Sequence, residues 1–207
     1  MSSWNTVASA GSVEKTAAAL KAHGYEVAVV ATGADAKKKA LEWIPAGSEV
    51  LTASSITVDA VGLGAELNDT GKYDSVKTKT FKMDRATQAR EIRKLTTAPD
   101  FVVGSVHALA EDGTALIASM TGSQLPAYLF GAGTVIWVVG TNKIVKDKAE
   151  GHRRLNEHVI DLESKRAAKA YGLPDTFRSF AGKLVEFNKD VNPARIKVIL
   201  VNEVLGQ

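Results

Sequence analysis

Short runs of glycine, serine and threonine occur at three places where a strand or turn would lead into the next element. Small residues there leave backbone N–H groups free, and such groups bind phosphate or carboxylate at the start of a helix. The alternative is that Ser55 and Ser123 only cap helices, each stabilising its helix by about 1 kcal/mol. We expect a shared anion site at Ser54 and Ser55, Gly113 and Thr114, and Gly122 and Ser123.

Glu111 is the candidate catalytic residue. It precedes Asp112 and Gly113 at the expected mouth of a sheet, after an otherwise apolar segment. A carboxylate in such a place can act as a base or nucleophile if partial burial raises its pKa. The alternative is a structural turn, because Asp-Gly is among the strongest hairpin signals and Glu111 would then only flank it.

Asn142 and Lys143 follow the apolar run from Thr134 to Gly140. At the end of a strand, Lys143 could meet a carboxylate or phosphate as a point charge. A solvated loop lysine is the alternative interpretation. His107, four residues before Glu111, is either a proton carrier or a buried structural imidazole.

The sequence argues against a metal centre. His152 and His158 are six residues apart on an expected helix, which places them on different faces. The chain has no cysteine, which excludes disulfides, zinc–thiolate sites and iron–sulfur ligation by this chain. No Gly-x-Gly-x-x-Gly, Walker or His-Glu-x-x-His pattern occurs, so the cofactor stays unknown.

The elements that must position these residues alternate between helix and strand, as in right-handed crossovers of a parallel sheet. In such sheets, ligands bind beyond the carboxyl ends of the strands. The fold class is therefore α/β, a mainly parallel open sheet flanked by helices, in a single domain over residues 1–207. Strands are expected at 25–31, 49–52, 101–105, 134–140 and 195–201, with a short one near 73–76 in a polar surface loop over 68–80. Helices are expected at 12–23, 34–43, 55–63, 84–95, 124–130 and 146–171, and Gly151 is the place where the last of them could break.

The composition is typical of a globular protein, with 45% hydrophobic and 24% charged residues. A cytoplasmic location is the default expectation. The first ten residues do not form a signal peptide, and no apolar stretch approaches the ~18 residues of a membrane span. The net charge of +3 is spread along the chain, which favours a small anionic metabolite over nucleic acid as the partner. A homodimer is expected only because it is the commonest oligomer.

Five segments carry a resemblance through their order and spacing: 54–58, 110–114, 121–123, 138–145 and 195–206. Together they resemble the LUD family, the lactate-utilisation domain formerly called DUF162. The similarity covers most of the chain from about Ala17 onward. The resemblance implies a fold similar to that of CoA transferases, ribose-5-phosphate isomerase and glucosamine-phosphate deaminase.

The resemblance also suggests partners and a role. Relatives in lactate operons work beside iron–sulfur and oxidoreductase partners, and here such partners would have to carry any cluster because the chain has no cysteine. In CoA transferases of this fold a catalytic glutamate lies in a Glu-Asn-Gly motif, which Glu111-Asp112-Gly113 resembles. Asp112 adds a like charge and removes an amide donor, which weakens the transfer of that role to Glu111.

Three hypotheses follow. The first is a protein of organic-acid metabolism that holds an anionic ligand with Glu111, Thr114, Ser123 and Lys143. The second is an enzyme acting on a CoA thioester or sugar phosphate, with Glu111 as nucleophile or base. The third is a non-catalytic partner or regulatory subunit.

Overall fold

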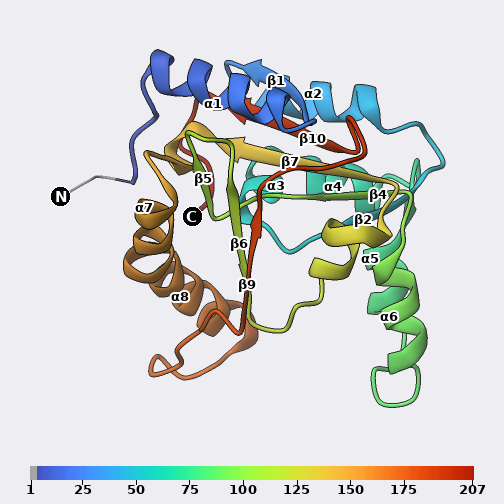
Figure 1. Cartoon of the computed structure of the whole chain (residues 1–207). Coiled ribbons are helices and arrows are strands. Elements are labelled where there is room, and N and C mark those ends of the chain that lie inside the picture. The colour runs from blue at the N-terminus through green and yellow to red at the C-terminus, as the bar shows by residue number, and fades with distance from the viewer. Residues whose placement is uncertain (1–3) are drawn as a thin grey trace.

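The computed structural model describes residues 4–207, and these residues form two sheets with helices around them (Figure 1). The larger sheet has six strands in the order β1-β10-β7-β4-β2-β3, and every pairing in it is parallel. The smaller sheet has the order β8-β5-β6-β9 and mixes both directions. The expected α/β class with a mainly parallel sheet is confirmed.

The larger sheet consists of β1 (Glu26–Val30), β2 (Glu49–Thr52), β3 (Asp74–Ser75), β4 (Phe101–Gly104), β7 (Thr134–Gly140) and β10 (Ile196–Val201). The smaller sheet consists of β5 (Ala108–Ala110), β6 (Ala115–Ser119), β8 (Ile144–Val145) and β9 (Lys183–Phe187). The α-helices are α1 (Ala10–Ala22), α2 (Gly33–Trp43), α3 (Ile56–Ala60), α4 (Leu63–Asp69), α5 (Val76–Phe81), α6 (Ala89–Thr97), α7 (Lys148–Arg154) and α8 (Ile160–Tyr171). Two segments are π-helical, η1 (Ala127–Gly131) and η3 (Leu155–Val159), and η2 (Thr141–Lys143) is a 3₁₀ turn.

The central strands are apolar on both faces because both faces of the larger sheet are covered. On β7, Trp137 and Val139 belong to one core cluster, whereas Ile136 and Val138 belong to the other. The first core lies against α1, η1 and the smaller sheet, and the second lies against α2, α3 and α4. Figure 1 shows β6 and β9 crossing the direction of β4 and β7 on the side of the first core.

Five details differ from the sequence-based expectation. Gly62, with φ of 72°, divides the helix expected over 55–63, and α4 starts beyond it. Residues 76–81 form α5 where a polar loop was expected, since Ser75 accepts the Thr78 N–H and caps a helix there. None of the four strands of the smaller sheet was expected. The helix expected from Asp84 begins only at Ala89. The helix does not break at Gly151, which packs closely on Leu116, and it continues from α7 through η3 into α8.

Candidate functional site

A cavity of about 340 Å³ lies beyond the carboxyl ends of three neighbouring strands. Ser54 and Ser55 follow β2, Ser105 follows β4, and Lys143 follows β7, and all four residues line the cavity. Since β2, β4 and β7 are adjacent and parallel, their carboxyl ends reach the same edge of the sheet. This is where open parallel sheets bind ligands.

Lys143 is the buried cation of the cavity and keeps only 3% of its surface exposed. Its Nζ donates to the Thr57 Oγ1 at 2.9 Å, the Ser105 Oγ at 3.1 Å and the Val106 carbonyl at 3.2 Å. Within residues 4–207 no carboxylate pairs with it. Burial, with a smaller contribution from the charge of Arg154, lowers the pKa of Lys143 from 10.5 to about 7.

Arg154 on α7 is a second cation that is fully buried. Its Nη1 donates to the carbonyl of His107, while Nε and Nη2 have no hydrogen-bond partner among the described residues. Burial lowers its pKa to about 10, so the guanidinium stays charged. Lys143 and Arg154 therefore place positive charge beside the strand ends without a matching acid.

His107 lines the same cavity and is half-buried. Its Nδ1 accepts the Ala118 N–H at 3.2 Å, which assigns the ring proton to Nε2. Burial, together with the charges of Lys143 and Arg154, lowers its pKa to about 3. The imidazole is thus held by the smaller sheet as a neutral ring, able to donate a hydrogen bond from Nε2.

Helical residues complete the wall of the cavity. From α8, Arg166 donates to Glu163 through two hydrogen bonds of 2.7 and 2.6 Å and lies over the ring of Tyr171. From α5, the exposed Lys77 lines the cavity and makes no ion pair within the described part of the chain. Tyr128 from η1 is buried against Gly104, where a Cβ atom would collide with its hydroxyl.

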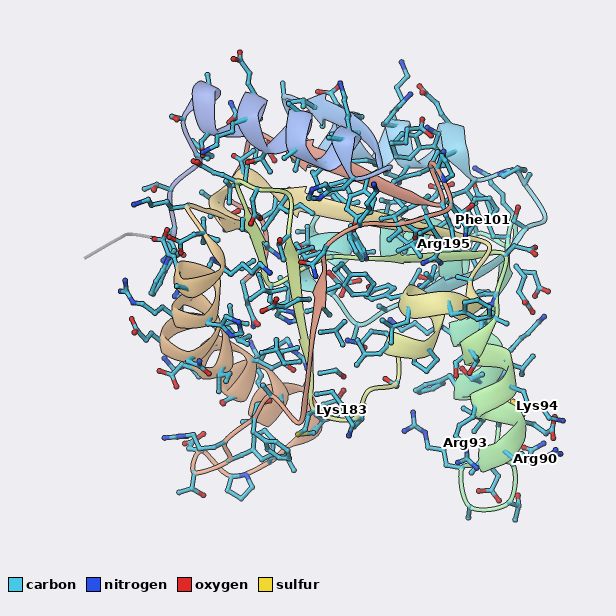
Figure 2. All side chains as sticks on the ribbon, in the orientation of Figure 1. Arg90, Arg93, Lys94, Phe101, Lys183 and Arg195 are labelled. Carbon is cyan, nitrogen blue, oxygen red and sulfur yellow. The ribbon has the colours of Figure 1, made fainter. Side chains whose placement is uncertain are left out.

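Other basic side chains lie away from this cavity. Figure 2 shows Arg90, Arg93 and Lys94 on α6, which extends away from the larger sheet, and Lys183 on β9. None of the four lines the cavity. The cations available to a ligand there are thus Lys77, Lys143 and Arg166.

The structure brings together part of the expected site. Ser54, Ser55 and Lys143 line one cavity, and Ser55 also caps α3 by accepting the Val58 N–H at 3.3 Å. Asn142 lies next to this cavity without lining it. Its Oδ1 accepts the Leu205 N–H at 3.1 Å and so holds the segment 203–207 over the strand ends.

Glu111, Gly113 and Thr114 lie elsewhere, in the turn of the β5–β6 hairpin, which packs on α1. The hairpin interpretation of the Asp-Gly pair is confirmed, with Gly113 at φ of 86°. Glu111 accepts hydrogen bonds from the Ser12 hydroxyl at 2.5 Å and the Lys15 ammonium at 2.9 Å. These two bonds lower the pKa of Glu111, in the direction opposite to the one expected for a general acid or base.

Gly122 and Ser123 form a turn after β6 and do not line the cavity either. Gly122 has φ of 86° and donates to the Ser119 hydroxyl, while the Ser123 N–H points to Thr121. No side chain caps η1, so Ser123 does not have the capping role considered for it. The three expected places therefore do not converge on one anion site.

The sequence interpretation missed Thr57, Ser105, Lys77 and Arg154. The same rule that found Ser54 and Lys143 could have found Ser105, which directly follows the β4 strand. Arg154 gave no signal, because only the packing of α7 on the smaller sheet shows which residue of the Arg153–Arg154 pair is buried. In the described range 4–207, no group of three or more acidic, histidine or cysteine side chains is arranged to hold a metal ion.

The comparisons with known proteins settle the family. The model of the LUD domain matches residues 13–201. The chain belongs to the LUD domain family. No match to a curated protein was found. Residues 4–207 contain no helix long and apolar enough to cross a membrane.

Solved structures place this LUD domain among known folds. The crystal structure of a DUF162 family protein from Deinococcus radiodurans is 16% identical, covers 93% of this chain and 98% of its own, and has a TM-score of 0.55. At this identity the likeness shows the fold alone. The structure of eIF2B beta from Chaetomium thermophilum is 11% identical and covers 66% of this chain and 44% of its own. Its TM-score is 0.29.

Proposed function

We propose that this LUD domain binds a small organic anion in the cavity beside Lys143, as a protein of organic-acid metabolism. The observation that carries the proposal is the buried cation Lys143, which lines the cavity and has no carboxylate partner in the described chain, while the charge of the buried Arg154 acts on it from outside the cavity. Burying charge without a counter-charge is costly. An anionic ligand would offset that cost, and the exposed Lys77 and the hydroxyls of Ser54 and Ser55 offer it further donors.

The size of the cavity supports a metabolite of a few carbon atoms. About 340 Å³ is at the lower end of the volumes of small-molecule sites. Lactate and pyruvate belong to this size class. The alternative enzyme, with Glu111 as nucleophile or base for a CoA thioester or sugar phosphate, draws no support from the geometry because Glu111 lies outside the cavity.

The proposal includes iron–sulfur or oxidoreductase partner proteins in the cytoplasm. Family membership supports this, and a chain without cysteine leaves cluster ligation by thiolates to a partner. Affinity purification of the tagged protein from its own cells, with iron analysis of the eluate, tests the partnership. Sedimentation velocity tests whether the protein forms the expected homodimer.

A thermal-shift titration tests the ligand proposal. Lactate, pyruvate, inorganic phosphate and a CoA thioester are the probes, each added to the pure protein. A ligand at about 100 times its Kd should raise the free energy of unfolding by about 2.7 kcal/mol. We expect this for a small carboxylate, and we expect Lys143→Met to lose it.

Lys146→Met is the matched control. Lys146 is exposed, lies three residues from Lys143 and does not line the cavity, so this variant should keep the full shift. Equal shifts in Lys143→Met and the wild-type protein would place the ligand elsewhere. Far-UV circular dichroism verifies that both variants fold.

A further inference from the structure

The shell of hydrogen bonds around the Lys143 Nζ suits a neutral amine. A neutral amine has two N–H donors and one lone pair, whereas the ammonium has three donors and no acceptor. The Val106 carbonyl can only accept, but the hydroxyls of Thr57 and Ser105 can donate as well. Their other acceptors, the carbonyls of Leu205 and Val106, are both 3.5 Å away, so either hydroxyl proton can turn to the amine lone pair.

The lowered pKa of Lys143 also favours the neutral amine. With a pKa of about 7, close to half of the Lys143 side chains are neutral at neutral pH, whereas an ordinary lysine is well under ~0.1% neutral. A buried lysine without an acidic partner is the environment in which lysines become nucleophiles. The other titratable side chains that line the cavity are Asp59, Lys77, His107, Tyr128, Glu163, Arg166 and Tyr171.

Two residues near Lys143 can bind the two functional groups of a 2-oxo acid, its carbonyl oxygen and its carboxylate. His107 is neutral and donates from Nε2, so it can hydrogen-bond a carbonyl oxygen without competing for a proton. Lys77 is exposed at the same cavity and unpaired within residues 4–207, so it can meet a carboxylate. One small cavity thus holds an amine, a neutral donor and a free cation.

We propose that Lys143 is a nucleophile that forms an imine with a small 2-oxo acid bound in this cavity. The inference rests on the proposed function, since the cavity must first hold the carboxylate. The amine nitrogen attacks the carbonyl carbon, and the nitrogen–carbon bond forms as the carbonyl π bond opens. One proton passes from nitrogen to oxygen, and the Thr57 or Ser105 hydroxyl can relay it.

The carbinolamine then loses water. The carbon–oxygen bond breaks, the oxygen leaves with a second proton from nitrogen, and the carbon–nitrogen double bond remains. Oxo acid and lysine thus give imine and one water molecule, with no oxidant or reductant. His107 is a positioning residue in this step, holding the oxygen by its Nε2–H while the bond forms.

Reductive trapping tests the imine. The folded protein is incubated at pH 7 with pyruvate and sodium cyanoborohydride, which reduces an imine to a stable secondary amine, and the digest is mapped by mass spectrometry. We expect the Lys143 peptide to be modified at least tenfold more than any surface-lysine peptide. The rate should reach half its maximum near pH 7, whereas surface lysines should require a much higher pH.

The variants separate the two proposals. Lys143→Arg keeps a cation and cannot form an imine, so it should lose the adduct, while Lys146→Met should keep it. A thermal shift with pyruvate but no preference for the Lys143 peptide overturns the imine and leaves anion binding intact. Neither shift nor adduct overturns both. If Lys143→Arg does not fold, the wild-type peptide map alone still shows whether the Lys143 peptide is modified more than the surface-lysine peptides.

Discussion

At the residue scale, Lys143 combines full burial with a shell of groups that carry no charge. The folded lysine binds its proton only below about pH 7, whereas the unfolded lysine binds it below about 10.5. Between these pH values the unfolded chain holds more protons, so the free energy of unfolding rises with pH. Below pH 7 the folded protein bears the full free-energy cost of burying the charged Lys143 ammonium. The lowering of the pKa from 10.5 to about 7 corresponds to a cost of roughly 5 kcal/mol at most.

Lys143→Met removes this cost but leaves Thr57, Ser105 and Val106 without their donor. The lost hydrogen bonds oppose the gain by about 1 kcal/mol each, and they do so at every pH. We therefore expect the variant to gain stability relative to the wild-type protein by a few kcal/mol more at pH 6 than at pH 10. Urea unfolding at both pH values measures the difference, and a pH-independent difference would contradict the lowered pKa.

At the element scale, the segment after β10 is tied to the segment after β7. Asn142 Oδ1 accepts the Leu205 N–H, and Gly206 packs so closely on Thr57 and Lys143 that a Cβ there would lie 3.1 Å from the lysine Nζ. Gly140 is equally crowded, since a Cβ would lie 2.8 Å from the Glu203 carbonyl. Residues 203–207 are thus a tightly fitted cover over the strand ends.

Asn142→Ala should loosen this cover. Losing one buried hydrogen bond costs about 1 kcal/mol, so the Leu205 amide should exchange with solvent roughly fivefold faster. Hydrogen exchange followed by NMR measures the rate. Asn188→Ala, which removes an asparagine beside the β5–β6 hairpin, is the control and should leave the Leu205 exchange unchanged.

Five of the six strands of the larger sheet were predictable as buried runs rich in apolar, mostly β-branched residues. The sixth, β3, has only the polar residues Asp74 and Ser75, and nothing in its own sequence marks it as a buried strand. The smaller sheet was not expected, since β5 and β8 have only three and two residues, and only Phe187 is buried in β9. Of the site, Ser54, Ser55 and Lys143 followed from the strand-end rule. Glu111 was singled out by a motif, but its hairpin turns toward α1, and no local pattern shows where a hairpin will pack.

At the scale of the whole molecule, Trp137 joins the two sheets. It lies on β7 with 1% of its surface exposed, and its ring meets Phe187 of β9 edge-on at a centroid distance of 5.0 Å. Tyr128 of η1 and Tyr25 beside β1 meet the same ring at 5.8 and 6.2 Å. The smaller sheet and the larger sheet therefore share one core.

Trp137→Ala should destabilise the protein by about 3–5 kcal/mol, the usual cost of emptying a large aromatic site. Trp137→Phe should cost less, because it keeps a ring and removes an indole N–H that has no hydrogen-bond partner within residues 4–207. Differential scanning calorimetry measures both. We expect a single transition in each variant, and two separate transitions would mean that the sheets unfold independently.

The position of β10 between β1 and β7 has a consequence for biosynthesis. Among the strands of residues 4–207, β1 pairs with β10 alone, so the strand Glu26–Val30 leaves the ribosome long before this partner, Ile196–Val201, is translated. Until then the nascent chain exposes two unpaired strand edges, that of β1 and that of β7. Chaperones bind such exposed edges, and aggregates form on them. Ribosome-stalled chains that stop short of Ile196 should accordingly remain chaperone-bound, and release should coincide with the emergence of β10.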